Sequence, residues 1–209
     1  STDPSSPEAA GMSSARLERI RPVMESYVRE RGVAGISTMV SRRGRIVHTA
    51  QFGYQDKEAG TPMAADTIFR IYSMTKPIVS TALMLLHEEG RFQLEHPVAQ
   101  YLPAFATTKV LGADGVLVDQ ARPMQVRELL MHTSGLTYDF MADNPVAQLY
   151  RDARIMNDAT RTLAALVDDL AALPLAFQPG SRWHYSVGID VAARLIEVLS
   201  GQSVGDFLQ

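Results

Sequence analysis

A helical segment over residues 73–89 constrains the fold most, because it leaves almost no polar surface. Its apolar side chains fall on nearly every side of the helix: Ile78, Val79, Ala82, Leu83, Met84, Leu85 and Leu86. A helix that is apolar nearly all round is normally buried inside a protein. Gly90 marks its end. We therefore expect this helix to lie in a core, covered by other elements on most sides.

Only two convincing strands accompany this helix, and both lie near the start of the chain. Residues 33–40 are typical of a buried strand, residues 45–52 of a second, and the turn at 41–44 predicts a hairpin. A third strand is possible around 116–118. A lone hairpin is only marginally stable in water, and packing the helix on it leaves one sheet edge open. We therefore interpret the chain as the N-terminal part of a longer protein; the alternative is a small helical protein with one hairpin.

The rest of the chain is largely helical in pattern. Apolar residues at helical spacing predict helices over 14–31, interrupted or kinked at Pro22, and over 126–131, 160–173 and 188–199. Ser203 is typical of the N-cap of one more helix. Residues 1–11 are rich in Pro and Ser, and we expect them to be flexible.

Composition excludes several classes of function. The formal net charge is −3 without a basic stripe, so we expect no nucleic-acid partner. No apolar run approaches the roughly 20 residues of a membrane-spanning helix, so we expect no membrane partner. The chain has no cysteine, which excludes disulfides and thiolate catalysis. Its first residues do not resemble a signal peptide, so we expect a cytoplasmic location, or a periplasmic one if a signal peptide was removed.

Ser73 and Lys76 form a Ser-x-x-Lys motif at the start of the apolar helix. Three-residue spacing places both side chains on one helix face, one turn apart. Pro77 fits the first turn, where a missing N–H costs little. The helix N-terminus favours developing negative charge at Ser73, and a serine hydroxyl needs a nearby base to attack a carbonyl. The motif therefore predicts a nucleophilic serine that forms a covalent acyl-enzyme.

Lys76 can act in two ways, and both stay open at this point. Burial lowers the pKa of a lysine, so that Lys76 can be a neutral base, whereas a protonated Lys76 helps electrostatically. Away from any active site, the motif would be an N-cap serine followed by a solvated lysine. The strongly apolar run directly after Lys76 is a poor place for a solvated side chain, which favours catalysis.

Four segments carry a family resemblance. They are Phe69-Arg70-Ile71-Tyr72-Ser73-Met74-Thr75-Lys76-Pro77, Leu129-Leu130-Met131-His132-Thr133-Ser134-Gly135-Leu136, Pro179-Gly180 followed by Trp183-His184-Tyr185-Ser186, and Gly201-Gln202-Ser203-Val204. In this order they resemble segments of serine β-lactamase-like enzymes, especially the family VIII carboxylesterases. The resemblance implies an α/β fold of the β-lactamase/transpeptidase type, with a largely antiparallel sheet flanked by helices and a helical subdomain at about 73–200.

The resemblance also implies roles for residues far from Ser73. In class C β-lactamases and their relatives, a Tyr-x-Asn segment places a tyrosine beside the nucleophile, where it works with the lysine as general base and acid. The matching segment is Tyr185-Ser186-Val187, so Val187 stands where the asparagine would help hold a lactam side chain. This departure favours the esterase branch. Tyr138 and Trp183 follow motif segments closely and are expected to wall an acyl pocket; the alternative for Tyr138, Trp183 and Tyr185 is core packing.

The superfamily's C-terminal strand, with Lys-Thr-Gly or a variant, has no counterpart here. In the family it supplies one oxyanion-hole N–H, the other being that of the nucleophilic serine. We therefore expect residues 12–209 to be the N-terminal portion of one β-lactamase-like catalytic domain. We further expect a C-terminal complement, as a second chain or a missing segment, without which the chain is inactive.

The combined expectation is a serine hydrolase that cleaves a small-molecule ester or amide substrate, above all a carboxylic ester, without a metal or organic cofactor. Alternatives are an acyltransferase of the same fold, a β-lactamase or D-Ala-D-Ala peptidase, and a non-catalytic penicillin-recognising or scaffold module. His132 and Ser134 do not predict a Ser–His pair, because they lie two residues apart in a loop and no Gly-x-Ser-x-Gly elbow is present. We interpret His132-Thr133-Ser134-Gly135 as a structural turn.

Overall fold

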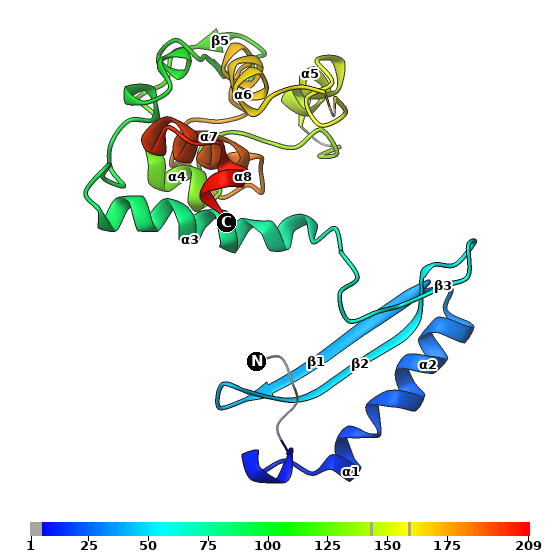
Figure 1. Ribbon diagram of the computed structural model, residues 1–209. Helices are drawn as coiled ribbons and strands as arrows, with labels where there is room; N and C mark the ends of the chain where they lie inside the picture. Colours follow the sequence, from blue (N-terminus) through cyan, green and yellow to red (C-terminus); the bar gives the residue numbers. More distant parts are fainter. Residues whose placement is uncertain (1–5, 143, 159) are drawn as a thin grey trace. The chain divides into compact units, whose positions relative to one another are not determined.

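The computed structural model describes residues 6–142, 144–158 and 160–209. The chain divides into two compact units, Ser1–Arg70 and Ile71–Gln209 (Figure 1). Of the segment expected to be flexible, residues 1–5 lie outside the described residues, and Glu8–Ala10 forms a 3-10 turn, η1. The interpretation of residues 12–209 as part of a single domain stays a prediction.

The first unit is built on an antiparallel three-stranded sheet. Its further elements are α1 (Ser14–Leu17), α2 (Ile20–Glu30), β1 (Gly35–Arg42), β2 (Arg45–Asp56) and β3 (Thr61–Pro62), with the strands in the order β1-β2-β3. The hairpin predicted from the sequence is confirmed, with a register shift between Val40 and Ser41. The helix expected over 14–31 is broken between α1 and α2, and Pro22 lies in the first turn of α2, where it needs no N–H partner.

The burial expected for the first strand was wrong. No residue of β1 is buried; half-buried and exposed residues alternate along most of it. The physical reason is that Ser37, Thr38 and Ser41 interrupt its apolar run, and β1 forms the edge of the sheet. A strand with such a sequence needs cover on one face only.

The second unit is mostly helical. It contains η2 (Tyr72–Met74), α3 (Thr75–Glu88), η3 (Val98–Gln100), η4 (Pro103–Ala106), β4 (Val110–Leu111), β5 (Leu117–Val118), α4 (Val126–Leu130), α5 (Pro145–Asp152), α6 (Leu163–Ala172), α7 (Gly188–Ser200) and α8 (Val204–Phe207). Ser203 caps α8 as predicted, because its side chain accepts from the Asp206 N–H. The strand expected around 116–118 pairs with β4 in a separate two-stranded sheet and does not extend the hairpin.

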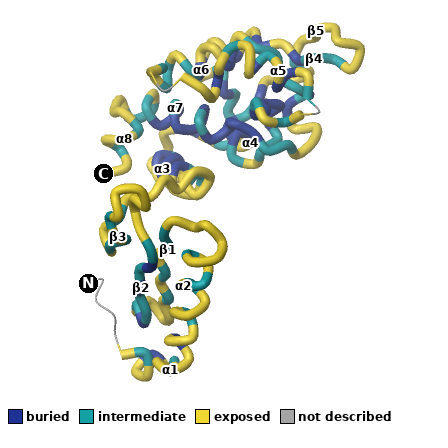
Figure 2. The backbone as a smooth tube through the Cα atoms, turned by 90° about the vertical axis from the view of Figure 1, so that its right-hand side faces the viewer, coloured by how far each residue is buried: buried dark blue, intermediate teal, exposed yellow. Residues whose placement is uncertain are grey.

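Helix α7 lies at the centre of this unit. It contacts α3, α4, α6 and α8, and Figure 2 shows α4 and much of α7 as buried. Its buried residues include Val191, Ala192, Leu195 and Ile196, whose spacing of one, three and one residues keeps them on one face of the helix. Helices α3, α4, α6 and α8 therefore converge on α7, which begins directly after the segment that carries Tyr185.

The burial expected for the apolar helix was only half right. On α3 the buried residues are Val79, Ala82, Leu83 and Leu86, whereas Ile78 is 48% exposed and Leu85 is 50% exposed. The side of α3 that faces α7 is covered, and the side that carries Ile78 and Leu85 presents apolar surface. No helix in the described part of the chain combines the length and apolar character needed to cross a bilayer.

Gly180 of the Pro-Gly motif packs against a charged pair beneath the loop. The Glu128 carboxylate is buried and forms an ion pair with Arg122, and it also accepts from the Gln125 N–H at 2.9 Å. A Cβ at residue 180 would lie 2.6 Å from the Glu128 Oε1 and would collide with the Arg122 guanidinium. The backbone of Gly180 also has a φ of +81°, which disfavours any side chain.

We therefore expect Gly180→Ala to destabilise the protein by about 2–4 kcal/mol, since it combines backbone strain with disruption of an ion pair whose carboxylate is buried. Gly115→Ala is the matched control, because Gly115 has a φ of +79° but no atom lies within 4 Å of the position that the new methyl group would take. The control should lose about 1 kcal/mol from backbone strain alone. Urea-unfolding midpoints measure the loss of stability in both variants. Equal losses of stability would contradict the role given to the Arg122–Glu128 pair.

Candidate active site

Ser73 lies in the 3-10 turn η2, which leads directly into α3. The preceding residue, Tyr72, has a φ of +44°, a conformation that non-glycine residues rarely adopt. Such backbone strain clusters at functional sites. The Lys76 Nζ lies 3.3 Å from the Ser73 Oγ, so the turn and the helix bring the two motif residues together as their spacing predicts.

Tyr185 joins this pair from a segment 112 residues further along the chain. Its hydroxyl lies 2.5 Å from the Ser73 Oγ, a short hydrogen bond in which either oxygen can donate. The Lys76 Nζ lies 4.8 Å from the centroid of the Tyr185 ring. The three residues expected to be catalytic therefore meet around one oxygen atom, the Ser73 Oγ.

Backbone hydrogen bonds hold the Tyr185 segment against the His132–Gly135 turn. The His184 N–H donates to the His132 carbonyl at 2.7 Å, and the Gly180 N–H donates to the Thr133 carbonyl at 2.7 Å. The His132 ring lies against the Tyr185 ring, with 4.8 Å between the centroids. The turn therefore positions Tyr185, which agrees with its interpretation as structural.

Tyr138 makes a contact that sequence reasoning missed. It was expected to wall a pocket, and it does line the cavity described below, but its hydroxyl also accepts from the Lys76 Nζ at 2.9 Å. Its side chain is buried, only 6% exposed. The Lys76 ammonium is thus held between Ser73 and Tyr138, in a position set by two elements distant in sequence.

The pKa values of Lys76 and Tyr185 are shifted in opposite directions. Burial alone lowers the pKa of Lys76, but its attraction to Tyr138 and Tyr185 outweighs that effect, and the net pKa is raised. The pKa of Tyr185 is lowered, first by its interaction with Lys76 and then by the hydrogen bond with Ser73, against the smaller opposing effect of burial. Burial raises the pKa of Tyr138. Lys76 is therefore protonated at neutral pH, and Tyr185 is the group that ionises more readily than usual.

A cavity of about 600 Å³ opens beside the Ser73 Oγ. Its wall includes Ser73, Lys76, Tyr138 and Tyr185. Most of the remaining wall is apolar and includes Val79, Phe140, Met156, Leu163, Ile189 and Ala193. A concave, mainly apolar site with a few convergent polar groups is the usual form of a small-molecule site.

Among the described residues, Asp190 is the one carboxylate in this wall, and sequence reasoning missed it. It stands in the first turn of α7, five residues after Tyr185, where an acidic residue is ordinary because the helix N-terminus favours it. The sequence signal was therefore weak, and only the path of α7 turns this residue into the cavity.

Two residues expected to bind substrate lie elsewhere. Trp183 is 66% exposed and lines a neighbouring hollow together with Met141 and Asn144. Val187 is buried at the N-terminus of α7 and does not line the cavity. The substrate-binding roles of Trp183 and Val187 stay predictions, without support from the cavity beside Ser73.

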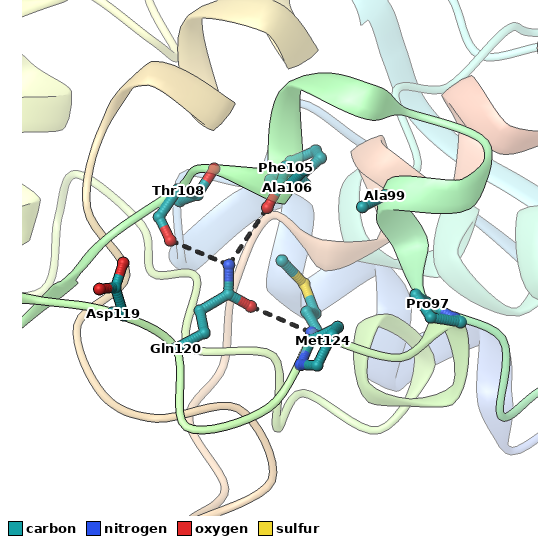
Figure 3. A pocket seen from close by; sticks show the side chains of 9 residues that line it. Pro97, Ala99, Phe105, Ala106, Thr108, Asp119, Gln120 and Met124 are labelled. Carbon is teal, nitrogen blue, oxygen red and sulfur yellow. Dashed lines mark hydrogen bonds between the residues drawn. The ribbon is translucent and has the colours of Figure 1, made fainter.

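A second hollow, of about 210 Å³, lies near Pro97 and Gln120 (Figure 3). The amide of Gln120 crosses it and donates to the carbonyls of Phe105 and Thr108, at 3.1 and 2.9 Å, and accepts from the Met124 N–H at 3.0 Å. These bonds tie η4 and the residues directly after it to the loop before α4. The polar groups of Gln120 are thus used within the fold, and the hollow is structural.

Comparison with known proteins gives a consistent picture. The beta-lactamase family model, described as "Beta-lactamase", matches residues 19–209. Esterase EstB of Burkholderia gladioli is 35% identical over 201 residues, which cover 94% of this chain and 49% of EstB. Protein Rv1367c of Mycobacterium tuberculosis is 37% identical over 168 residues, which cover 78% of this chain and 41% of that protein.

The fold is similar to that of a hydrolase whose structure has been solved. EstCE1, described as a hydrolase with promiscuous acyltransferase activity, aligns with a TM-score of 0.80 and 30% identity. The alignment covers 92% of this chain and 49% of EstCE1. This chain therefore spans about half the length of the relatives it matches, and the mixed α/β architecture expected from the sequence is confirmed.

Proposed function

Because this chain belongs to the beta-lactamase family, we propose that it carries the nucleophile, the cation and the general base of a serine carboxylesterase. The observation that carries the proposal is the meeting of Tyr185 and Lys76 at the Ser73 Oγ, at 2.5 and 3.3 Å. The similarity to an esterase, EstB, supports esters as the substrate class.

In the proposed acylation step, the ionised oxygen of Tyr185 takes the proton of Ser73 as the Ser73 Oγ attacks the ester carbonyl. The ester C=O becomes an oxyanion in the tetrahedral intermediate, and the Ser73 N–H is one donor available to it. When the intermediate collapses, Tyr185 returns the proton to the departing alkoxide. An alcohol leaves, and the acyl group stays on Ser73.

Deacylation reverses these roles with water. Tyr185 accepts a proton from a water molecule as that water attacks the acyl carbonyl, and then returns it to the Ser73 Oγ as the carboxylic acid leaves. The protonated Lys76 stays charged throughout and stabilises the phenolate form of Tyr185. This assignment is supported by the raised pKa of Lys76 and the lowered pKa of Tyr185, because Lys76 then keeps its proton while Tyr185 loses its proton at lower pH and becomes available as the base.

We propose that activity requires a C-terminal complement, as a second chain or as a further segment, and we call the combination the complete enzyme. The coverage of about half of each relative supports this. The exposed apolar side of α3, which carries Ile78 and Leu85, also supports a complement, because contiguous apolar surface on a folded protein is usually covered by another segment or a partner. The second oxyanion donor would come from the complement.

Acyl transfer is the second candidate. It is favoured by the likeness to EstCE1, a hydrolase with promiscuous acyltransferase activity, and by the apolar cavity, in which an alcohol competes well with water for the acyl group. Release of an acyl product with an added alcohol, faster than hydrolysis, would identify the transferase. The β-lactamase alternative is disfavoured by Val187, which cannot supply the amide of an asparagine.

The test is covalent labelling of the complete enzyme with a p-nitrophenyl alkylphosphonate, followed by intact-mass and peptide analysis. We expect one adduct per chain, located on the peptide that contains Ser73, with release of one equivalent of p-nitrophenol. Denatured protein is the control and should stay unlabelled. A folded complete enzyme without an adduct, or with one on another residue, would overturn the proposed nucleophile.

A further inference from the structure

We propose that Asp190 makes the cavity selective for charge on the acyl group, favouring acyl groups that carry an ammonium and rejecting those that carry a carboxylate. The proposal rests on the proposed function, because it names the substrate class for the same cavity. It concerns recognition and gives Asp190 no part in the chemical steps.

The carboxylate of Asp190 shares one cavity with the nucleophile. Both Asp190 and Ser73 line the space of about 600 Å³, and the neighbours of Asp190 on the same side of α7, Ile189 and Ala193, are apolar. An acyl group attached to the Ser73 Oγ and extending along this wall passes the carboxylate. The wall therefore presents one carboxylate, together with the Lys76 ammonium and the Tyr185 oxygen, in otherwise mainly apolar surroundings.

No other described residue donates a hydrogen bond to the Asp190 carboxylate, and the bonds of its polar neighbours in the site run to one another. The Lys76 ammonium donates to Tyr138 at 2.9 Å and to Ser73 at 3.3 Å. The Tyr185 hydroxyl is bonded to Ser73 at 2.5 Å. Asp190 is half-buried, and a half-buried carboxylate gains from a charged donor held beside it. A donor on the substrate would supply the missing partner.

The electrostatic environment agrees with this geometry. Burial raises the pKa of Asp190, and the charge of Lys76 opposes that effect. The titratable groups that share the cavity wall with Asp190 and act on its charge are Lys76 from α3 and the hydroxyls of Tyr138 and Tyr185. Lys76 balances part of the charge, but two of its three N–H groups are directed to Ser73 and Tyr138. A second carboxylate in the cavity would meet like charge in a poorly solvated space, whereas an ammonium would form a charge-assisted hydrogen bond.

The experiment compares three p-nitrophenyl esters on the complete enzyme at pH 8: hexanoate, 6-aminohexanoate and the monoester of adipate. The leaving group is the same, so that only the charge at the far end of the acyl chain differs. We expect kcat/KM to be higher for the amino ester than for the adipate ester. In Asp190→Asn, the ratio of kcat/KM for the amino ester to kcat/KM for the adipate ester should fall at least about tenfold, mainly through KM. Asp190→Glu should still prefer the amino ester.

The control is Asp168→Asn, which makes the same charge change at an exposed position of α6 and should leave the ratio unaltered. Rates are expressed per site titrated with the phosphonate, so that misfolded protein does not contribute. An unaltered ratio in Asp190→Asn would overturn the proposal. An equal change for all three esters, with a shifted pH profile, would overturn it as well and make Asp190 a positioning residue for Lys76. Absence of labelling at Ser73 in the unmodified enzyme would instead contradict the proposed function.

Discussion

Replacing Ser73 with alanine is expected to lower kcat/KM for an ester by about 10⁴–10⁶-fold, because it removes the oxygen that both Tyr185 and Lys76 contact. The variant keeps Tyr185, Lys76 and the cavity, so any remaining rate reflects binding and electrostatic effects alone. Stopped-flow release of p-nitrophenol measures both the burst and the steady rate. The burst should disappear entirely in Ser73→Ala.

Ser181→Ala is the matched control. Ser181 is exposed and follows the Pro-Gly motif, so its hydroxyl is available to solvent but lies outside the contacts around Ser73. Activity and burst should be unaltered in this variant. A Ser73→Ala enzyme that keeps a burst of one equivalent, confirmed by mass analysis of the acylated protein, would assign the nucleophile to another residue.

The parts of the site that follow from the sequence are those set by local spacing. The separation of Ser73 and Lys76 is fixed by one helical turn, so periodicity was sufficient to predict their contact at 3.3 Å. Tyr185 could not be paired with Ser73 in this way, because 112 residues separate them, and only the resemblance to a family connected them. Long-range contacts depend on the packing of α7 against α3, which no local pattern records.

The features that sequence reasoning missed share this cause. Tyr138 was assigned to a wall, but its bond to Lys76 depends on where the loop after the His132–Gly135 turn passes. Asp190 lies in the first turn of a helix, where an acidic residue is common and does not by itself indicate a binding role. Helix α5 was missed as well, although Asn144 followed by Pro145 is a recognisable helix start.

Burial was the least predictable property of all. The composition of α3 indicated cover on nearly every side, yet Ile78 and Leu85 are about half exposed. An apolar pattern records which surface a residue prefers to have covered, and it does not record which segment supplies the cover. The same limit explains the wrong burial prediction for β1. Its valine and isoleucine indicated a buried strand, whereas Ser37 and Thr38 are compatible with the edge position that the structure shows.

Replacing Tyr185 with phenylalanine is expected to lower kcat/KM by about 10²–10⁴-fold, the usual contribution of a general base. Tyr138→Phe is the matched control, because it removes one hydroxyl that contacts Lys76 but not Ser73. That control should lose about tenfold, the contribution of a single hydrogen bond to a charged group. Losses of equal size in the two variants would contradict the assignment of Tyr185 as the base.

The pH dependence gives the sharper test of the same assignment. Tyr185 must be ionised to act, so kcat/KM should rise as pH increases through the lowered pKa of Tyr185, and fall only when pH exceeds the raised pKa of Lys76. The interaction with Lys76 is the largest cause of the lowered pKa of Tyr185. Lys76→Met should therefore move the rising limb to higher pH, since the phenolate loses its cation. If Lys76 were instead a neutral base, the rising limb would follow the lysine and disappear in this variant, and the residual rate would no longer depend on pH in that range.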